Sequence, residues 1–253
     1  MEHVADQPNG CTHTKLAQGL GIPKSSLTAL LNDLQSQGYL QRNAESGIYT
    51  IGVQILSLAN AYLRNLNLAR LGAPIVGELY AAVRMFSVMA IPNETEYVVI
   101  CTESLPSLFT HSLQVGYRGP LYCSAVGRAI LAYLPERRVD EILRASDLTP
   151  LTPLTKTDPT AIKAELAEVR KSGISHSKEE NIAGITGIAS PVFDRTGTPV
   201  AAVAIAAPTA QLETAQLPSI GLAVKQAADK LSEQLGWRDQ RALAADRDSR
   251  IPA

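Results

Sequence analysis

The chain has 253 residues, of which 45% are hydrophobic and 19% charged, and its formal net charge is −1. This composition indicates one large or two modest globular domains, and it excludes a disordered chain and a strongly basic protein that coats nucleic acid. The longest apolar run, residues 200–207, is far too short to span a bilayer, and the first residues lack a signal-peptide pattern. Three cysteines without CxxC spacing are typical of reduced thiols. We therefore expect a cytoplasmic protein without a membrane partner.

The N-terminal part of the chain predicts two short helices followed by a β-hairpin. Residues 14–20 form a short helix that stops at Gly21, and Pro23 then occupies a favoured first-turn position of a second helix. Strand-like residues 39–41 and 48–51 flank a polar turn. This order of elements is the outline of a winged helix-turn-helix. Leucines at i, i+3, i+4 and i+7 predict one buried stripe on the second helix, formed by Leu27, Leu30, Leu31 and Leu34.

The rest of the chain alternates helical and strand-like segments. Residues 54–83 predict a long amphipathic helix and a second helix that starts after Pro74, and together they would connect two domains. Asp158 and Gly173 are the expected cap and end of a later helix. Antiparallel strand pairs separated by helices predict an α+β domain. The other expected elements are strands at 86–91, 97–102 and 107–114, a helix at 124–134, a hairpin at 187–193 and 199–207, and a last helix at 218–236.

Short motifs along the chain occur in an order similar to that of one protein family. In the first part they are Leu16-Ala17, Gly21-Ile22-Pro23-Lys24-Ser25-Ser26, Gly38-Tyr39-Leu40 and Tyr49-Thr50-Ile51-Gly52. In the second part they include Gly116, Pro120-Leu121-Tyr122, Ser124-Ala125-Val126-Gly127-Arg128-Ala129, Leu154-Thr155, Glu179-Glu180, Gly184 and Ala189-Ser190-Pro191-Val192. No single motif is decisive, but the ordered set resembles the IclR family of bacterial transcriptional regulators.

The resemblance implies an α+β protein with separate DNA-binding and ligand-binding parts. These are a winged helix-turn-helix at residues 1–53, a connector helix at 54–70, a GAF-like effector-binding domain with an antiparallel sheet at 71–240 and a flexible tail at 241–253. Only residues 1–6 are available for the first helix of the family's DNA-binding domain. Members of the family act as homodimers or dimers of dimers on palindromic double-stranded operators, since a two-fold protein reads two half-sites.

The predicted recognition helix carries short hydrogen-bonding side chains near its N-terminus, where they can reach base edges and phosphates. A solvated polar face is the alternative interpretation. Residues 1–50 contain three Lys and Arg against four Asp and Glu, a net charge of 3 − 4 = −1. Because cationic side chains normally supply nonspecific affinity, we expect weak binding by a monomer and a strong dependence on dimerisation and salt. The expected DNA-binding residues are Lys24, Ser25, Ser26, Thr28 and Asn32 on the helix and Arg42 and Asn43 on the wing.

The resemblance also implies a pocket for a small organic acid. Ala204 and Ala206 stand where hydroxyl residues can occur, so a tiny polar acid would find few partners, and we expect a larger aromatic acid or related amide. His111 and Ser177 are the expected polar anchors. Free N–H groups at the start of helix 124–134 would favour a carboxylate, although close packing of this helix on the sheet is a competing explanation. The expected effector-binding residues are Leu108, His111, Gly119, Ser124, Ala125, Val126, Ser177, Ile185, Gly187, Ala204 and Ala206.

A hydrolase that uses Cys123 or Ser124 is the alternative of a different class. Cys123 could pair with His111, or Ser124 with His176, but neither pair has a nucleophile-elbow motif or an evident third member. His176 and the Glu179-Glu180 pair have a spacing compatible with a metal, whereas the favoured interpretation is a solvent-facing loop in which the two carboxylates form salt bridges or caps. The glycines lack the context of a phosphate-binding loop. We therefore expect no enzymatic activity, no cofactor and no metal.

Overall fold

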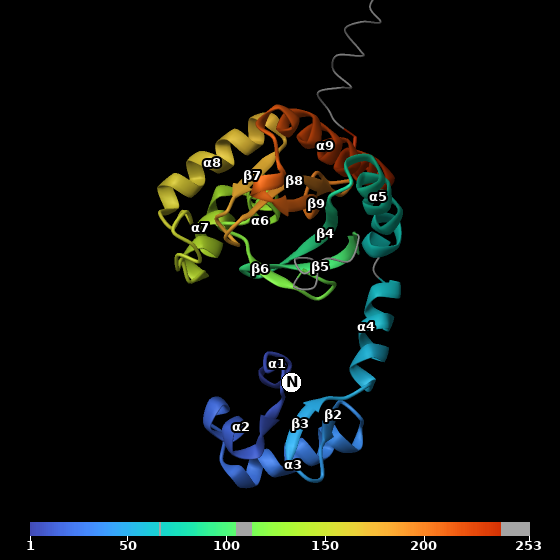
Figure 1. Ribbon diagram of the computed structural model, residues 1–253, viewed down its shortest axis with the longest axis vertical. Coiled ribbons are helices and arrows are strands. Elements are labelled where there is room, and N and C mark those ends of the chain that lie inside the picture. Colours follow the sequence, from blue (N-terminus) through green and yellow to red (C-terminus); the bar gives the residue numbers. More distant parts are fainter. Residues whose placement is uncertain (66, 105–112, 239–253) are drawn as a thin grey trace, which may run out of the picture. The chain divides into compact units, whose positions relative to one another are not determined.

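The computed structural model describes residues 1–65, 67–104 and 113–238 (Figure 1). The chain divides into two compact units, Met1–Asn67 and Leu68–Ala253. None of the helices in these described ranges is both long and apolar enough to cross a membrane.

The first unit is a winged helix-turn-helix, as predicted. Its three strands form an antiparallel sheet in the order β1-β3-β2. Gly21 has a φ of 63°, a left-handed conformation that glycine adopts without steric cost, and it ends α2 at the expected place. The elements are α1 (Glu2–Ala5), β1 (Cys11–Thr12), α2 (His13–Leu20), α3 (Lys24–Ser36), β2 (Leu40–Arg42), β3 (Ile48–Ile51) and α4 (Gln54–Asn65).

The core of the first unit is small, so it covers only a narrow strip of the surface of α3. Leu27 and Leu31 are buried, Leu34 packs at the margin, but Leu30 is 48% exposed. At 100° per residue Leu30 lies on the far side of Leu27 from Leu31, just outside the strip that the core can cover. The prediction of a four-leucine stripe was therefore wrong at Leu30. The buried apolar residues are Val4, Cys11, Leu16, Ala17, Leu27, Leu31, Leu40 and Tyr49.

The second unit is built on a six-stranded sheet with the order β6-β5-β4-β9-β8-β7, and every neighbouring pair is antiparallel. The α+β class is thus confirmed. The two edge strands, β6 and β7, are short and polar, so no alternation of apolar residues predicted them. The expected strand at 107–114 lies mostly outside the described residues. The strands are β4 (Phe86–Asn93), β5 (Glu96–Glu103), β6 (Arg118–Pro120), β7 (Ser175–Lys178), β8 (Ile185–Phe193) and β9 (Pro199–Pro208).

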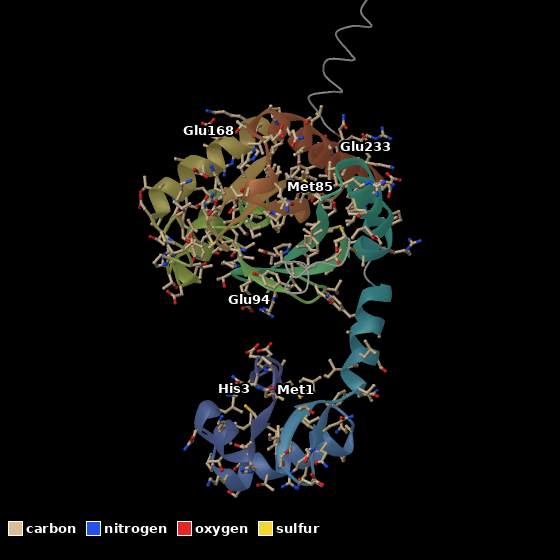
Figure 2. All side chains as sticks on the ribbon, in the orientation of Figure 1. Met1, His3, Met85, Glu94, Glu168 and Glu233 are labelled. Atoms are coloured by element: carbon tan, nitrogen blue, oxygen red, sulfur yellow. The ribbon has the colours of Figure 1, made fainter. Side chains whose placement is uncertain are left out.

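Helices cover both faces of this sheet (Figure 1). On one face α6 (Ala125–Leu131) lies against the strands, and α7 (Glu136–Ala145) and α8 (Pro159–Ser172) pack beside it. The other face carries α5 (Asn67–Val83) and α9 (Leu217–Gln234), which the Lys230–Glu78 ion pair joins. Exposed Glu168 on α8 and Glu233 on α9 point away from the sheet (Figure 2).

Two helices differ from the sequence-based expectation. Pro74 lies inside α5 rather than at the start of a helix, although a proline there removes one backbone hydrogen bond. Helix α7 was not predicted, even though its buried residues Val139, Ile142 and Leu143 have helical spacing. By contrast, the Asp158 side chain accepts hydrogen bonds from two backbone N–H groups and Gly173 ends α8 with a φ of 77°, as predicted.

Candidate functional sites

The second unit has a partly open pocket between α6 and the sheet, with a cavity volume of about 60 Å³. Alternation along β4 and β9 turns Phe86, Val88 and Ala204 toward this side of the sheet, while Met89 faces the helices on the opposite side. Gly187 on β8 permits a close approach of α6, since a Cβ atom at this position would lie 3.3 Å from the Cβ of Ala125. The cavity therefore owes its shape to small residues on both facing surfaces.

The structure brings most of the expected effector-binding residues around this one cavity. Gly119 is not part of the lining, because the Tyr97 side chain covers it, with the Tyr97 hydroxyl 2.6 Å from where a Cβ of residue 119 would lie. Leu108 and His111 lie outside the described residues. The expected residues that line the cavity are Ser124, Ala125, Val126, Ser177, Ile185, Gly187, Ala204 and Ala206.

Sequence reasoning missed a polar corner of the cavity. Tyr97 and Asn181 line it, and the Asn181 side chain acts to lower the pKa of both Tyr97 and the neighbouring Tyr117. Burial raises the pKa of Tyr97 and of Tyr117, so both phenols remain protonated at neutral pH. The alternation along β5 could have identified Tyr97 as a lining residue, whereas no pattern marks Asn181. The other missed residues are Phe86, Val88, Val99, Leu113, Ile182 and Ile205.

The two serine hydroxyls of the cavity are already engaged within the protein. Ser124 Oγ donates to the carbonyl of Pro120 at 2.7 Å and accepts from the N–H of Gly127 at 3.0 Å, which caps α6. Ser177 Oγ donates to the carbonyl of Cys123 at 2.8 Å. A hydroxyl whose proton is used in this way can only accept a hydrogen bond from a ligand. Since none of the described lining residues is charged, the cavity is apolar with one polar corner.

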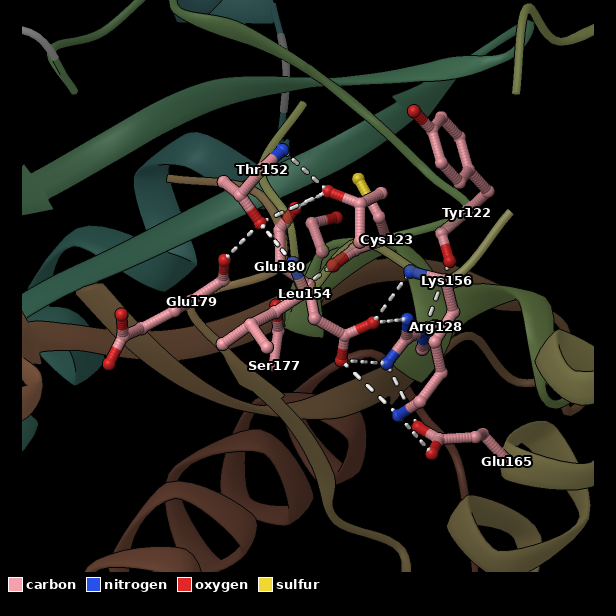
Figure 3. A network of polar contacts seen from close by, with 12 residues as sticks. Tyr122, Cys123, Arg128, Thr152, Leu154, Lys156, Glu165, Ser177, Glu179 and Glu180 are labelled. Atoms are coloured by element: carbon pink, nitrogen blue, oxygen red, sulfur yellow. Dashed lines mark hydrogen bonds and ion pairs between the residues drawn. The ribbon is translucent and has the colours of Figure 1, made fainter. Parts of the chain in front are cut away.

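A network of ion pairs surrounds the buried guanidinium of Arg128 (Figure 3). The side chain of Arg128 on α6 is fully buried, and its guanidinium donates to both carboxylate oxygens of Glu180 and, at 3.0 Å, to the carbonyl of Tyr122. Glu165 on α8 accepts from Arg128 at 2.9 Å and from Lys156 at 2.5 Å. A buried guanidinium is tolerated only when it is paired in this manner.

Glu180 is the acidic centre of this network. Burial alone would raise the pKa of Glu180, but hydrogen bonds and charge from Arg128, together with Lys156, outweigh burial and hold this pKa below its usual value. The prediction that the carboxylate forms a salt bridge is confirmed. The prediction of a solvent-facing position was wrong for Glu180, which is only 5% exposed, because the buried charge of Arg128 requires it inside.

The same network holds the segment that follows β7. Thr152 Oγ1 donates to the carbonyl of Glu179 at 2.7 Å, and Thr155 Oγ1 donates to the carbonyl of Glu180 at 2.6 Å. The next two residues, Asn181 and Ile182, line the cavity. Arg128 and its partners thus fix one wall of the cavity without lining it.

The geometry gives no support to a hydrolase. The Ser124 hydroxyl is bonded to Pro120 rather than to His176, and Cys123 is buried, which raises the pKa of its thiol to about 11. A protonated thiol and a capping hydroxyl are not activated nucleophiles. Within the described ranges, no three His, Cys, Asp or Glu side chains lie together as a metal site requires.

The expected DNA-binding residues all lie exposed on the first unit. Lys24, Ser25 and Ser26 form the first turn of α3, and Thr28 and Asn32 follow on later turns. On the wing, the guanidinium of Arg42 lies 5.9 Å from the centroid of the Tyr49 ring. The side-chain oxygen of Asn43 accepts from two backbone N–H groups at 2.9 Å and shapes the turn, so only its amide group remains for a further contact.

Both units match models of one protein family. The model described as "IclR helix-turn-helix domain" matches residues 1–44, and the one described as "Bacterial transcriptional regulator IclR C-terminal" matches residues 60–233. The chain is 28% identical over 238 residues to the Transcriptional repressor IclR of Escherichia coli K12, covering 93% of this chain and 87% of that protein.

Solved structures agree with this assignment. The crystal structure of Thermotoga maritima IclR matches with a TM-score of 0.71 and 25% identity, covering 93% of this chain and 95% of the other. An IclR homolog from Microbacterium hydrocarbonoxydans, crystallised with 4-hydroxybenzoate, has the same fold, with a TM-score of 0.74 and 22% identity over 90% and 92% of the two chains. Since family models account for both its DNA-binding unit and most of its second unit, the protein belongs to the IclR family of bacterial transcriptional regulators and is a DNA-binding regulator rather than an enzyme.

Proposed function

We propose that this regulator binds double-stranded operator DNA as a homodimer or a dimer of dimers, and that an aromatic acid or related amide bound in its second unit changes its affinity for the operator. The observation that carries the proposal is the apolar cavity with a single polar corner, in a domain linked to a helix-turn-helix. We also propose that the protein is cytoplasmic, and its free buried cysteines support this location.

The lining of the cavity supports a partly apolar ligand. Its walls are aliphatic and aromatic, and Tyr97 and Asn181 offer hydrogen bonds at one corner. A tiny oxo acid would leave most of its polar atoms without partners there, which is costly when they are buried. An aromatic ring finds apolar walls, and the related Microbacterium protein holds 4-hydroxybenzoate. These points favour an aromatic acid over glyoxylate or pyruvate.

The size of the cavity suggests how a ligand could act. Its volume of about 60 Å³ is well below the roughly 150 Å³ of an apolar cavity that admits benzene. An aromatic ligand therefore does not fit wholly inside this volume, and it either extends through the open side of the pocket or moves part of the wall when it binds. A ligand that fits one arrangement of the wall better than another shifts the equilibrium between them, and this difference in affinity is what can be transmitted to the DNA-binding unit.

The apolar surface of α4 supports the homodimer. Leu58 and Tyr62 on one side of this helix are 51% and 57% exposed, and Leu56 is also exposed. Neighbouring apolar side chains of this kind on a helix surface mark an interaction site. A second copy of the same helix is the partner that a two-fold operator requires. Dimerisation would also double the few cationic contacts of each recognition unit.

A thermal-shift experiment tests the proposed ligand class. We expect benzoate or 4-hydroxybenzoate to raise the melting temperature, whereas glyoxylate and pyruvate leave it unchanged, because a ligand stabilises the state that binds it. Ala206→Leu fills the cavity and should abolish the stabilisation by aromatic acids. The matched control Ala167→Leu, on an exposed position of α8, should retain it. Stabilisation by glyoxylate or pyruvate with none by the aromatic acids would refute the proposed class.

A further inference from the structure

His13 is tied to the recognition helix by a hydrogen bond whose direction can be assigned. It is the first residue of α2, and its Nε2 lies 2.9 Å from Thr28 Oγ1 on α3. The single proton of the Thr28 hydroxyl is donated to the carbonyl of Lys24 at 2.8 Å. Thr28 therefore accepts from His13, and Nε2 of the imidazole carries a proton.

This bond leaves the other ring nitrogen available. Nδ1 of His13 makes no hydrogen bond with any residue that the structure describes, and the ring is half-buried. Thr28 itself is exposed on the face of α3 that carries the expected DNA contacts. Since Thr28 has already given its proton to Lys24, it cannot donate to a base or phosphate. The group that can do so at this point of the surface is the His13 ring.

The charges around His13 make a protonated ring useful. On the helices packed against α2, the charged or titratable groups are Lys24 and Asp33 on α3 and Glu2 and His3 on α1, and α2 itself adds Lys15. Among the described residues none of these groups forms an ion pair with His13. Residues 1–50 contain three Lys and Arg, so the recognition surface is poor in cations. One more positive group would therefore contribute noticeably to the attraction of phosphates.

We propose that His13 is a DNA-contacting residue, positioned by Thr28 at the junction of α2 and α3, and that its imidazolium binds an operator phosphate. The inference rests on the proposed operator binding and adds a residue to it. Neutral imidazole presents a lone pair at Nδ1, whereas imidazolium presents an N–H donor, so only the protonated ring binds a phosphate oxygen. Lowering the pH favours the imidazolium form of histidine, so operator affinity should be higher at acidic than at alkaline pH.

Anisotropy titrations of a labelled duplex from upstream of the protein's own gene test the proposal with the full-length chain. We expect His13→Gln, which keeps a donor for Thr28 but no charge, to weaken binding near pH 6 and to have little effect near pH 8. Near pH 6 it should also reduce the salt slope of log K by about 1 for each DNA-bound subunit. His13→Lys should bind tightly at both pH values. His3→Ala, on α1, controls for the other histidine of the unit and should keep the wild-type pH response.

Two further results separate positioning from a general effect on folding. Thr28→Val removes the hydroxyl and should weaken binding near pH 6 in the wild-type chain but not in the His13→Gln chain, with unchanged melting temperatures. If His13→Gln binds the operator like the wild type at both pH values, the role of His13 is refuted while operator binding itself stands. If the wild-type chain does not distinguish this duplex from an unrelated one, the proposed function and this inference fail together.

Discussion

Arg128 places a full positive charge in the interior of the second unit, where, among the residues that the structure describes, Glu180, Glu165 and a backbone carbonyl compensate it. Removing one partner of a buried pair leaves an uncompensated charge, which typically costs about 3–5 kcal/mol. We expect Glu180→Gln to lower the free energy of unfolding by about this amount in urea denaturation. The control Arg137→Ala breaks an i,i+4 pair whose arginine side chain is 91% exposed, and it should cost less than about 0.5 kcal/mol. Equal effects of the two substitutions would contradict this role of the network.

The lowered pKa of Glu180 fixes the sign of a pH dependence. A carboxylate whose pKa is lower in the folded than in the unfolded chain stabilises the fold above its unfolded pKa of about 4.3, and this contribution is lost as the pH falls through the folded value. The stability difference between the wild type and Glu180→Gln should therefore be largest near neutral pH and shrink below about pH 4. Unfolding curves at a series of pH values measure it. A difference that grows on acidification would show that the pair does not work as described.

At the scale of residues, the sequence predicted the small side chains of the cavity better than its polar corner. Ala125, Gly187 and Ala204 were expected at the positions where they line the cavity, since motif order places them on facing elements. Asn181 was not expected, because its position depends on a loop held by Arg128 and Thr155 through long-range hydrogen bonds. The burial of Glu180 was missed for the same reason. Its buried partner Arg128 lies far away in the sequence, so nothing near Glu180 in the sequence indicates that the carboxylate is buried.

Among the elements, α4 has the clearest unexplained surface. Leu58 and Tyr62 lie on the same side of the helix, four residues apart, while exposed Ser57 lies about 100° around the helix from Leu58 and about 140° from Tyr62. In the proposed homodimer a charge at position 58 must be buried without a partner. We expect Leu58→Glu to shift the protein from dimer toward monomer in sedimentation-velocity experiments and to weaken operator binding.

The matched variant Ser57→Glu introduces the same charge on α4, pointing away from Leu58 and Tyr62. Its dimer fraction should equal that of the wild type. Should both variants sediment as the wild type does, α4 would not be the contact between copies, and the proposed dimer would need another surface.

The sequence predicted elements with a strong period or a sharp boundary. Helix α8 was expected because Asp158 and Gly173 mark its ends, and the β8–β9 hairpin because a polar turn separates two apolar runs. The short edge strands β6 and β7 were missed, since three or four mostly polar residues pair only because a sheet edge is available. The continuation of α5 through Pro74 likewise depends on its packing against the sheet, which overrides the local preference.

For the whole molecule, 23 basic and 24 acidic residues give a near-neutral charge, but the few cations of the DNA-binding residues 1–50 are what determine the attraction for DNA. Residues 1–50 are slightly acidic, so in the proposed oligomer the attraction for DNA comes from few contacts repeated in each copy, and salt strongly weakens the phosphate contacts. The order of the two domains could be predicted from motif order alone. The size and polarity of the ligand cavity could not, since they follow from how distant segments pack.

The central claim is that a ligand in the second unit controls binding of the first unit to DNA. The most direct measurement is an anisotropy titration of the full-length chain against the duplex upstream of its own gene, with and without 4-hydroxybenzoate as the probe. We predict sequence-preferring binding that weakens steeply with salt and an affinity that changes when the probe is added. Binding that is equal for operator and unrelated DNA, or that is unaffected by a probe shown to raise the melting temperature, would contradict the account.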